Sequence, residues 1–64
     1  REPRPFLEEL EESTVFSFNR KLFVKGRRMR TRFRCRCLND RRIYFIDPTA
    51  EVHLEHPLAA RRAS

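Results

Sequence analysis

The sequence has one glycine, no tryptophan and no long apolar run. A single glycine excludes the glycine-rich loops with which nucleotide-binding enzymes hold phosphates. No stretch approaches the roughly 20 apolar residues that a membrane-spanning helix needs, and none has the charged, apolar and small layout of a signal peptide. With 64 residues, the chain has room for one small domain, which buries only about 60% of its unfolded surface. Neither histidine has a nucleophile beside it, so we expect no enzyme.

Basic residues are abundant and unevenly placed. The formal net charge is +6, and 13 of the 15 basic residues are arginine. Residues 19–46 hold eleven of these 15 against a single acid, Asp40, whereas residues 1–18 and 47–64 are mildly acidic. A basic block of this kind points to a polyanionic partner, with nucleic acid first and an anionic membrane surface second. Arginine suits phosphate because its planar fork binds in two places and stacks on bases.

The pattern along the chain predicts a mostly β (α+β) fold. We expect an extended arm over 1–5, one domain over 6–57 and a tail over 58–64. Phe6, Leu7 and Leu10 share the face of a short helix over 6–12, which must dock to be stable. From Thr14 the period changes to two, which is typical of strands. The expected architecture is a small antiparallel meander of three or four strands.

The clearest strand pattern covers residues 28–37. Met29, Thr31, Phe33, Cys35 and Cys37 alternate there with arginines, so one face is apolar and the other basic. The basic face holds Arg28, Arg30, Arg32, Arg34 and Arg36. On one strand these guanidinium groups would lie about 6.6 Å apart, from a rise of about 3.3 Å per residue. That spacing is close to the phosphate spacing of a nucleic-acid strand.

Turn and strand signals surround this pattern. Gly26 is the residue best able to take a positive φ, so we expect a turn at 25–27. A turn is also expected at 38–41. Residues 22–24 either continue the strand expected over 15–18 or begin a second strand after a turn at 19–20. The remaining expected strands are 42–47 and 51–55, with Val52 packed in the last of them.

The aromatic residues can serve either the core or a base-stacking surface. Phe16, Phe18, Phe23, Phe33 and Phe45 are expected in the core, because a small domain without tryptophan needs their bulk. Tyr44 lies on the face opposite Ile43 and Phe45, so it is the ring expected to meet a partner.

Two cysteines and two histidines form a possible metal set. A disulfide between Cys35 and Cys37 on one strand is strained, which favours a reduced, intracellular pair. With His53 and His56 they offer the four ligands of a Cys₂His₂ zinc site. Over residues 35–57 this arrangement resembles one zinc-binding family of small ribosomal proteins. The alternative is two packed cysteines and two surface histidines.

We therefore expect an RNA-binding structural component of a ribonucleoprotein, with a ribosome, including an organellar (mitochondrial) one, as the concrete case. Its phosphate contacts and its neighbouring-protein contacts would lie on the basic sheet face and the two arms. The residues expected to contact RNA are Arg20, Lys21, Lys25, Arg27, Arg28, Arg30, Arg32, Arg34, Arg36, Arg41, Arg42 and Tyr44. The alternative is a protein-interaction module that docks this face on an acidic protein or on a second copy.

Overall fold

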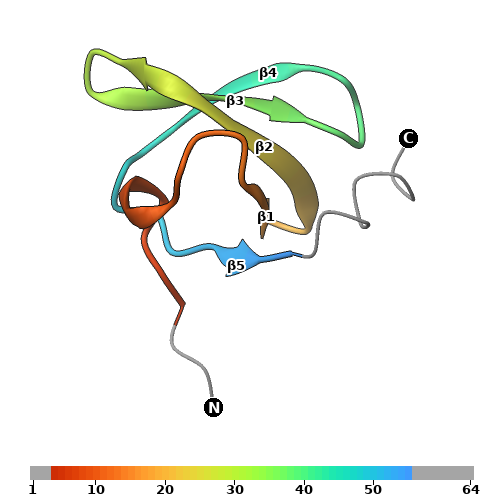
Figure 1. Cartoon of the computed structure of the whole chain (residues 1–64). Helices are drawn as coiled ribbons and strands as arrows, with labels where there is room; N and C mark the ends of the chain where they lie inside the picture. The colour runs from red at the N-terminus through yellow and green to blue at the C-terminus, as the bar shows by residue number, and fades with distance from the viewer. Residues whose placement is uncertain (1–3, 56–64) are drawn as a thin grey trace.

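The computed structural model describes residues 4–55 and contains one five-stranded antiparallel sheet. Its elements are a 3₁₀ turn η1 (Leu7–Glu9) and the strands β1 (Val15–Phe18), β2 (Lys21–Met29), β3 (Arg32–Cys37), β4 (Ile43–Ile46) and β5 (His53–Leu54). The strand order is β4-β3-β2-β1-β5, so four consecutive strands form a meander and the fifth returns to pair with the first (Figure 1). This arrangement confirms a small, mostly β fold, with five strands where three or four were expected. No helix within residues 4–55 has the length and apolarity to cross a membrane.

The helix expected over residues 6–12 is reduced to the single 3₁₀ turn η1. Its first amides bond to the loop between β4 and β5: Leu7 N donates to Ala50 O at 2.9 Å, and Glu8 N donates to Pro48 O at 2.9 Å. The Glu9 side chain accepts from the Phe6 amide at 3.0 Å. The loop thus accepts from the two amides that have no partner within the turn, and the segment is held in place with Leu7 fully buried.

The β-hairpin turns contain non-glycine residues of positive φ, and none of these turns contains Gly26. Asn19 and Arg20 have φ of 56° and 68° between β1 and β2, which confirms the alternative with a turn there. The next turn lies at 30–31, where Arg30 has a φ of 58°. The turn expected at 25–27 is wrong, because β2 runs straight through it.

Gly26 lies in a β-bulge of β2. Between the pairs Lys25↔Cys35 and Arg28↔Phe33, Gly26 and Arg27 together face the single residue Arg34. A Cβ atom on Gly26 would lie 2.2 Å from the Arg34 carbonyl oxygen. The glycine is therefore required by a close backbone approach, because its φ is not positive.

The core lies on the inner face of the curved sheet. Phe16 and Phe23 stack with ring centres 5.5 Å apart, and Phe33, Cys35 and Cys37 are buried beside them, as the alternation predicted. The other buried apolar residues are Leu7, Ile46 and Val52. η1 and the β4–β5 loop thus supply the rest of a core that the sheet alone would leave half covered.

Tyr44 lies on the face opposite Ile43 and Phe45, as predicted for β4, but the prediction of which face meets the core is wrong. Tyr44 pairs with Cys35 and lies on the inner face, where its ring meets the Phe23 ring edge-on at 5.5 Å. Ile43 and Phe45 lie on the outer face, where 52% of Phe45 is exposed. The run Ile-Tyr-Phe-Ile contains no charged residue, so its sequence could not fix which set faces the core.

Lys25 is a buried residue of the inner face and therefore cannot belong to the basic surface. Only 5% of it is exposed. Its ammonium group donates to the Leu10 carbonyl and lies 4.1 Å from the centre of the Phe33 ring. Backbone bonds from Ser13 N to Lys25 O and from Lys25 N to Thr14 O tie the same two segments together. Lys25 is thus the link between the N-terminal segment and β2.

Candidate nucleic-acid interface

Three arginines of β3 form a row on the outer face of the sheet. Arg32, Arg34 and Arg36 are all exposed, and the residues between them point into the core. Strand geometry places neighbours in the row about 6.6 Å apart. We call Arg32, Arg34 and Arg36 the arginine row. The β-strand alternation that predicted a basic face is confirmed for these three positions.

Arg28 and Arg30 do not continue the row. The turn at 30–31 separates Arg30 from β3, and its side chain projects from a residue of positive φ. Arg28 pairs with Phe33 after the bulge, so it lies on the inner face, with its guanidinium carbon 5.6 Å from the centre of the Phe33 ring. The five-arginine ladder expected on one strand is therefore wrong: two of its members belong to other parts of the surface.

Exposed apolar side chains flank the row on β4. Phe45 is the cross-strand partner of Arg34, and Ile43 is the partner of Arg36. Both are more than a third exposed, at 52% and 38%. Cross-strand partners have Cβ atoms about 5 Å apart, so each guanidinium group stands beside an apolar side chain. This face can contact a partner that carries both negative charge and flat apolar groups.

Acidic side chains of the described segment do not neutralise the row. Within residues 4–55 the one ion pair closer than 4.0 Å joins Lys21 to Asp40, so no arginine has a carboxylate partner at that distance. Hydrogen bonds from Thr49 hold the Asp47 carboxylate in its own loop and are the main reason that its pKa is lowered, while the charge of Arg32 lowers that pKa further. Within residues 4–55 the positive charge of the row is therefore not paired with a carboxylate.

Four further basic residues of the expected interface are exposed but lie off the row. Arg20 and Arg41 sit in turns with positive φ, Arg27 is in the bulge and Arg42 precedes β4. They can add to the field around the outer face without being part of its geometry.

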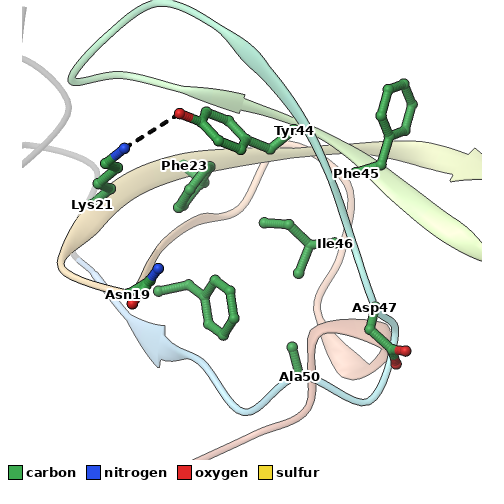
Figure 2. A pocket seen from close by; sticks show the side chains of 9 residues that line it. Asn19, Lys21, Phe23, Tyr44, Phe45, Ile46, Asp47 and Ala50 are labelled. Carbon is green, nitrogen blue, oxygen red and sulfur yellow. Dashed lines mark hydrogen bonds between the residues drawn. The ribbon is translucent and has the colours of Figure 1, made fainter.

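Lys21 and Tyr44 are joined to Asp40 in a small polar network (Figure 2 shows its Lys21–Tyr44 bond). The Tyr44 hydroxyl donates to Asp40 Oδ2 at 2.6 Å, and Lys21 Nζ donates to the Tyr44 oxygen at 3.3 Å. The pKa of Asp40 is held well below its ordinary value, first by the Tyr44 hydroxyl and then by the Arg42 amide. The same Tyr44 hydroxyl raises the pKa of Lys21. The Tyr44 hydroxyl is therefore hydrogen-bonded within the protein, and the exposed aromatic ring on β4 is that of Phe45.

The network gives a prediction about acid titration. Removing the hydroxyl with Tyr44→Phe should raise the pKa of Asp40 toward its ordinary value, as measured by NMR titration of the side-chain carboxyl. Because the native pKa is lowered, Asp40 stabilises the fold above about pH 4, and this contribution is lost as the pH falls through its native pKa. As the pH falls from about 4 through the native pKa of Asp40, the Tyr44→Phe variant should therefore lose less stability than the wild type does. Asp47, held by Thr49, is the internal control and should not move. An unchanged pKa of Asp40 would contradict the assignment.

The structure does not gather a zinc site from the described ligand candidates. Cys35 and Cys37 are free thiols at 0% exposure in the core, whereas His53 is exposed on β5. Residues 4–55 contain no group of three or more metal-ligating side chains, and His56 lies outside that range. Burial raises the pKa of the Cys35 thiol. Cys35 and Cys37 are therefore packed core residues, and the four-residue zinc set with His56 stays a prediction.

Comparisons with known protein families, with curated proteins and with solved structures find no match to the chain. The functional argument therefore rests on the surface itself. Sequence alternation could find the arginine row, but the exposed Phe45 beside it was missed. A four-residue apolar strand carries no signal for which face it presents.

Proposed function

We propose that the protein binds RNA through its outer face, with the arginine row on the phosphates. The observation that carries this proposal is the row of three arginines on alternate positions of β3, none of which lies within 4.0 Å of a carboxylate of residues 4–55. Like charges at this spacing repel one another, and a phosphate chain removes that repulsion. Each phosphate bound also releases counterions, which favours binding at low salt.

Phe45 and Ile43 give the face a second kind of contact. An exposed ring beside Arg34 offers a stacking surface for a base, and stacking tolerates any base because each has a π-face. Phosphate contacts set affinity and orientation without reading sequence. The proposed interface therefore favours unpaired RNA with weak sequence preference.

A small basic domain of this kind suits a structural component of a ribonucleoprotein particle. The concrete case we propose is a ribosome, cytoplasmic or organellar, where the domain would contact RNA and neighbouring proteins. The proposal is supported by the separation of faces in the sheet: the inner face holds the core, and the outer face is left for a partner.

The test is salt-dependent binding of a fluorescently labelled single-stranded RNA. Replacing Arg32, Arg34 and Arg36 with glutamine should weaken binding and reduce the slope of log K against log salt by about 2, since each single-strand phosphate contact contributes about 0.7. The matched control replaces Arg20, Arg28 and Arg30 with glutamine, which removes the same charge away from the row. An equal loss in both triple variants would contradict the proposed interface.

An acidic protein partner is the competing outcome, favoured by the exposed Ile43 and Phe45. In that case the complex recovered under native conditions would survive nuclease treatment. Binding to RNA would also be weak and unaffected by the position of the removed arginines.

A further inference from the structure

An apolar pocket opens beside β4 on the inner side of the sheet. Its volume is about 240 Å³, and its walls come from β1, β2, β4 and the loop that follows β4 (Figure 2). The apolar residues of its lining are Phe18, Phe23, Tyr44, Phe45, Ile46 and Ala50. Within the described segment β4 is an edge strand of the sheet, so the pocket lies beside a sheet edge.

The volume limits what can enter the pocket. An apolar cavity of about 150 Å³ is enough for benzene, whereas sites for drug-sized ligands begin at about 300 Å³. At about 240 Å³, this pocket fits one flat ring system. A whole nucleotide or a folded peptide segment is too large.

The chemistry of the pocket favours a neutral ring with a polar edge. The interior is aromatic and aliphatic, while Asn19, Lys21 and Asp47 supply hydrogen-bond donors and acceptors to the lining. A cationic guest is disfavoured, because Lys21 Nζ already lies 5.3 Å from the centre of the Tyr44 ring. A nucleobase has two apolar faces and an edge of donors and acceptors, so it matches this lining.

The pocket is close to the arginine row. Side chains alternate along β4: those of Tyr44 and Ile46 face the pocket, whereas Phe45, which also borders it, directs its ring away from it beside Arg34 (Figure 2). β3 and β4 are about 4.8 Å apart, as paired strands are. A strand of RNA whose phosphates follow the row therefore needs to cross only β4 to place one base in the pocket.

We propose that this pocket holds one unpaired base of the RNA whose phosphates contact the arginine row. The inference rests on the proposed function and adds its substrate class, which is RNA with an unpaired, everted base. Duplex RNA, whose bases are stacked and paired, does not offer such a group.

The experiment compares a labelled uridine decamer with an abasic sugar-phosphate chain of the same length, by fluorescence anisotropy. The variant is Ala50→Leu, which fills the pocket, and the matched control is Ala50→Ser, which leaves it open. The pocket should make wild type and Ala50→Ser favour the uridine RNA over the abasic chain about tenfold beyond the preference that stacking on Phe45 gives, within the range for one stacked base. Ala50→Leu should lose this added preference, keep the part that Phe45 supplies and keep its affinity for the abasic chain.

A second measurement needs no substitution. Tyr44 is the single tyrosine and the chain has no tryptophan, so the intrinsic fluorescence reports on the pocket wall. The uridine RNA should quench it, after correction for absorbance, and the abasic chain should not.

The outcomes separate this inference from the function on which it rests. If Ala50→Leu binds both RNAs as wild type does, or if both chains quench Tyr44 equally, the base is not in the pocket and only the inference is overturned. If Ala50→Leu weakens both RNAs equally, the effect does not come from the base, and the inference is overturned as well. If wild type binds neither RNA at low salt, the proposed function fails and the inference fails with it.

Discussion

Gly26→Ala should remove a large part of the stability of the fold. The new Cβ would lie 2.2 Å from the Arg34 carbonyl oxygen, a backbone atom of the neighbouring strand. Relief requires β2 and β3 to move apart at the bulge, which we expect to lower the free energy of unfolding by about 3 kcal/mol or more. A domain of this size has roughly 3 to 10 kcal/mol in total. Urea denaturation followed by circular dichroism measures the change.

The matched control for Gly26→Ala is Arg27→Ala in the same bulge. Arg27 is exposed and its Cβ is already accommodated, so this change should stay within about 0.5 kcal/mol. Equal stabilities of Gly26→Ala and Arg27→Ala would show that the close approach at Gly26 is not rigid.

Lys25→Ala should have the second largest effect, about 3 kcal/mol of lost stability. The substitution leaves the Leu10 carbonyl without its charged donor and removes the cation from the Phe33 ring. A hydrogen bond to a charged group contributes about 1.5 to 3 kcal/mol, and a desolvated cation–π contact about 2 kcal/mol. These contributions together exceed the expected net loss, because the variant no longer has to bury an ammonium group. Thermal and urea denaturation measure the net change.

Two variants show which part of Lys25 matters. Lys25→Met keeps the aliphatic packing and loses the charge, so it should recover part of the lost stability. Lys21→Ala removes a partly exposed lysine whose ion pair with Asp40 lies near the surface, and it should cost much less stability than Lys25→Ala. If Lys25→Ala were as mild as Lys21→Ala, the link between β2 and the N-terminal segment would have no energetic role.

The sequence predicted what depends on local pattern. Alternation at Phe33, Cys35 and Cys37 identified β3 and its buried face, and the Asn19 turn followed from a residue that tolerates a positive φ. The arginine row could be expected for the same reason. In each case the signal lay within a few neighbouring residues, which is the range over which strand and turn preferences act.

The features that the sequence analysis did not predict depend on contacts between residues that are far apart along the chain. Gly26 was expected to form a turn because glycine tolerates a positive φ. The structure instead requires glycine there because any side chain would collide with the Arg34 carbonyl on the neighbouring strand. Lys25 looked like a surface cation, and its burial depends on the Leu10 carbonyl from 15 residues earlier. The bulge then reversed the alternation of β2, which moved Arg28 off the basic face.

The bulge and the turn at 30–31 together limit the basic face of the proposed interface. Because Gly26 and Arg27 share one partner, Arg28 lies on the inner face, and the turn at 30–31 separates Arg30 from β3. The outer face therefore keeps the three arginines of the row, and the β3–β4 pairing sets their register with Ile43 and Phe45.

NMR mapping of a short single-stranded RNA on the uniformly labelled protein tests the central claim most directly. The account predicts that at low salt the largest shifts fall on the side chains of Arg32, Arg34 and Arg36 and on the Phe45 ring. It also predicts that they fade as salt is raised, while Arg28 and the buried Lys25 change little. Shifts centred on Arg28 and Arg30, or no shifts at low salt, would contradict it.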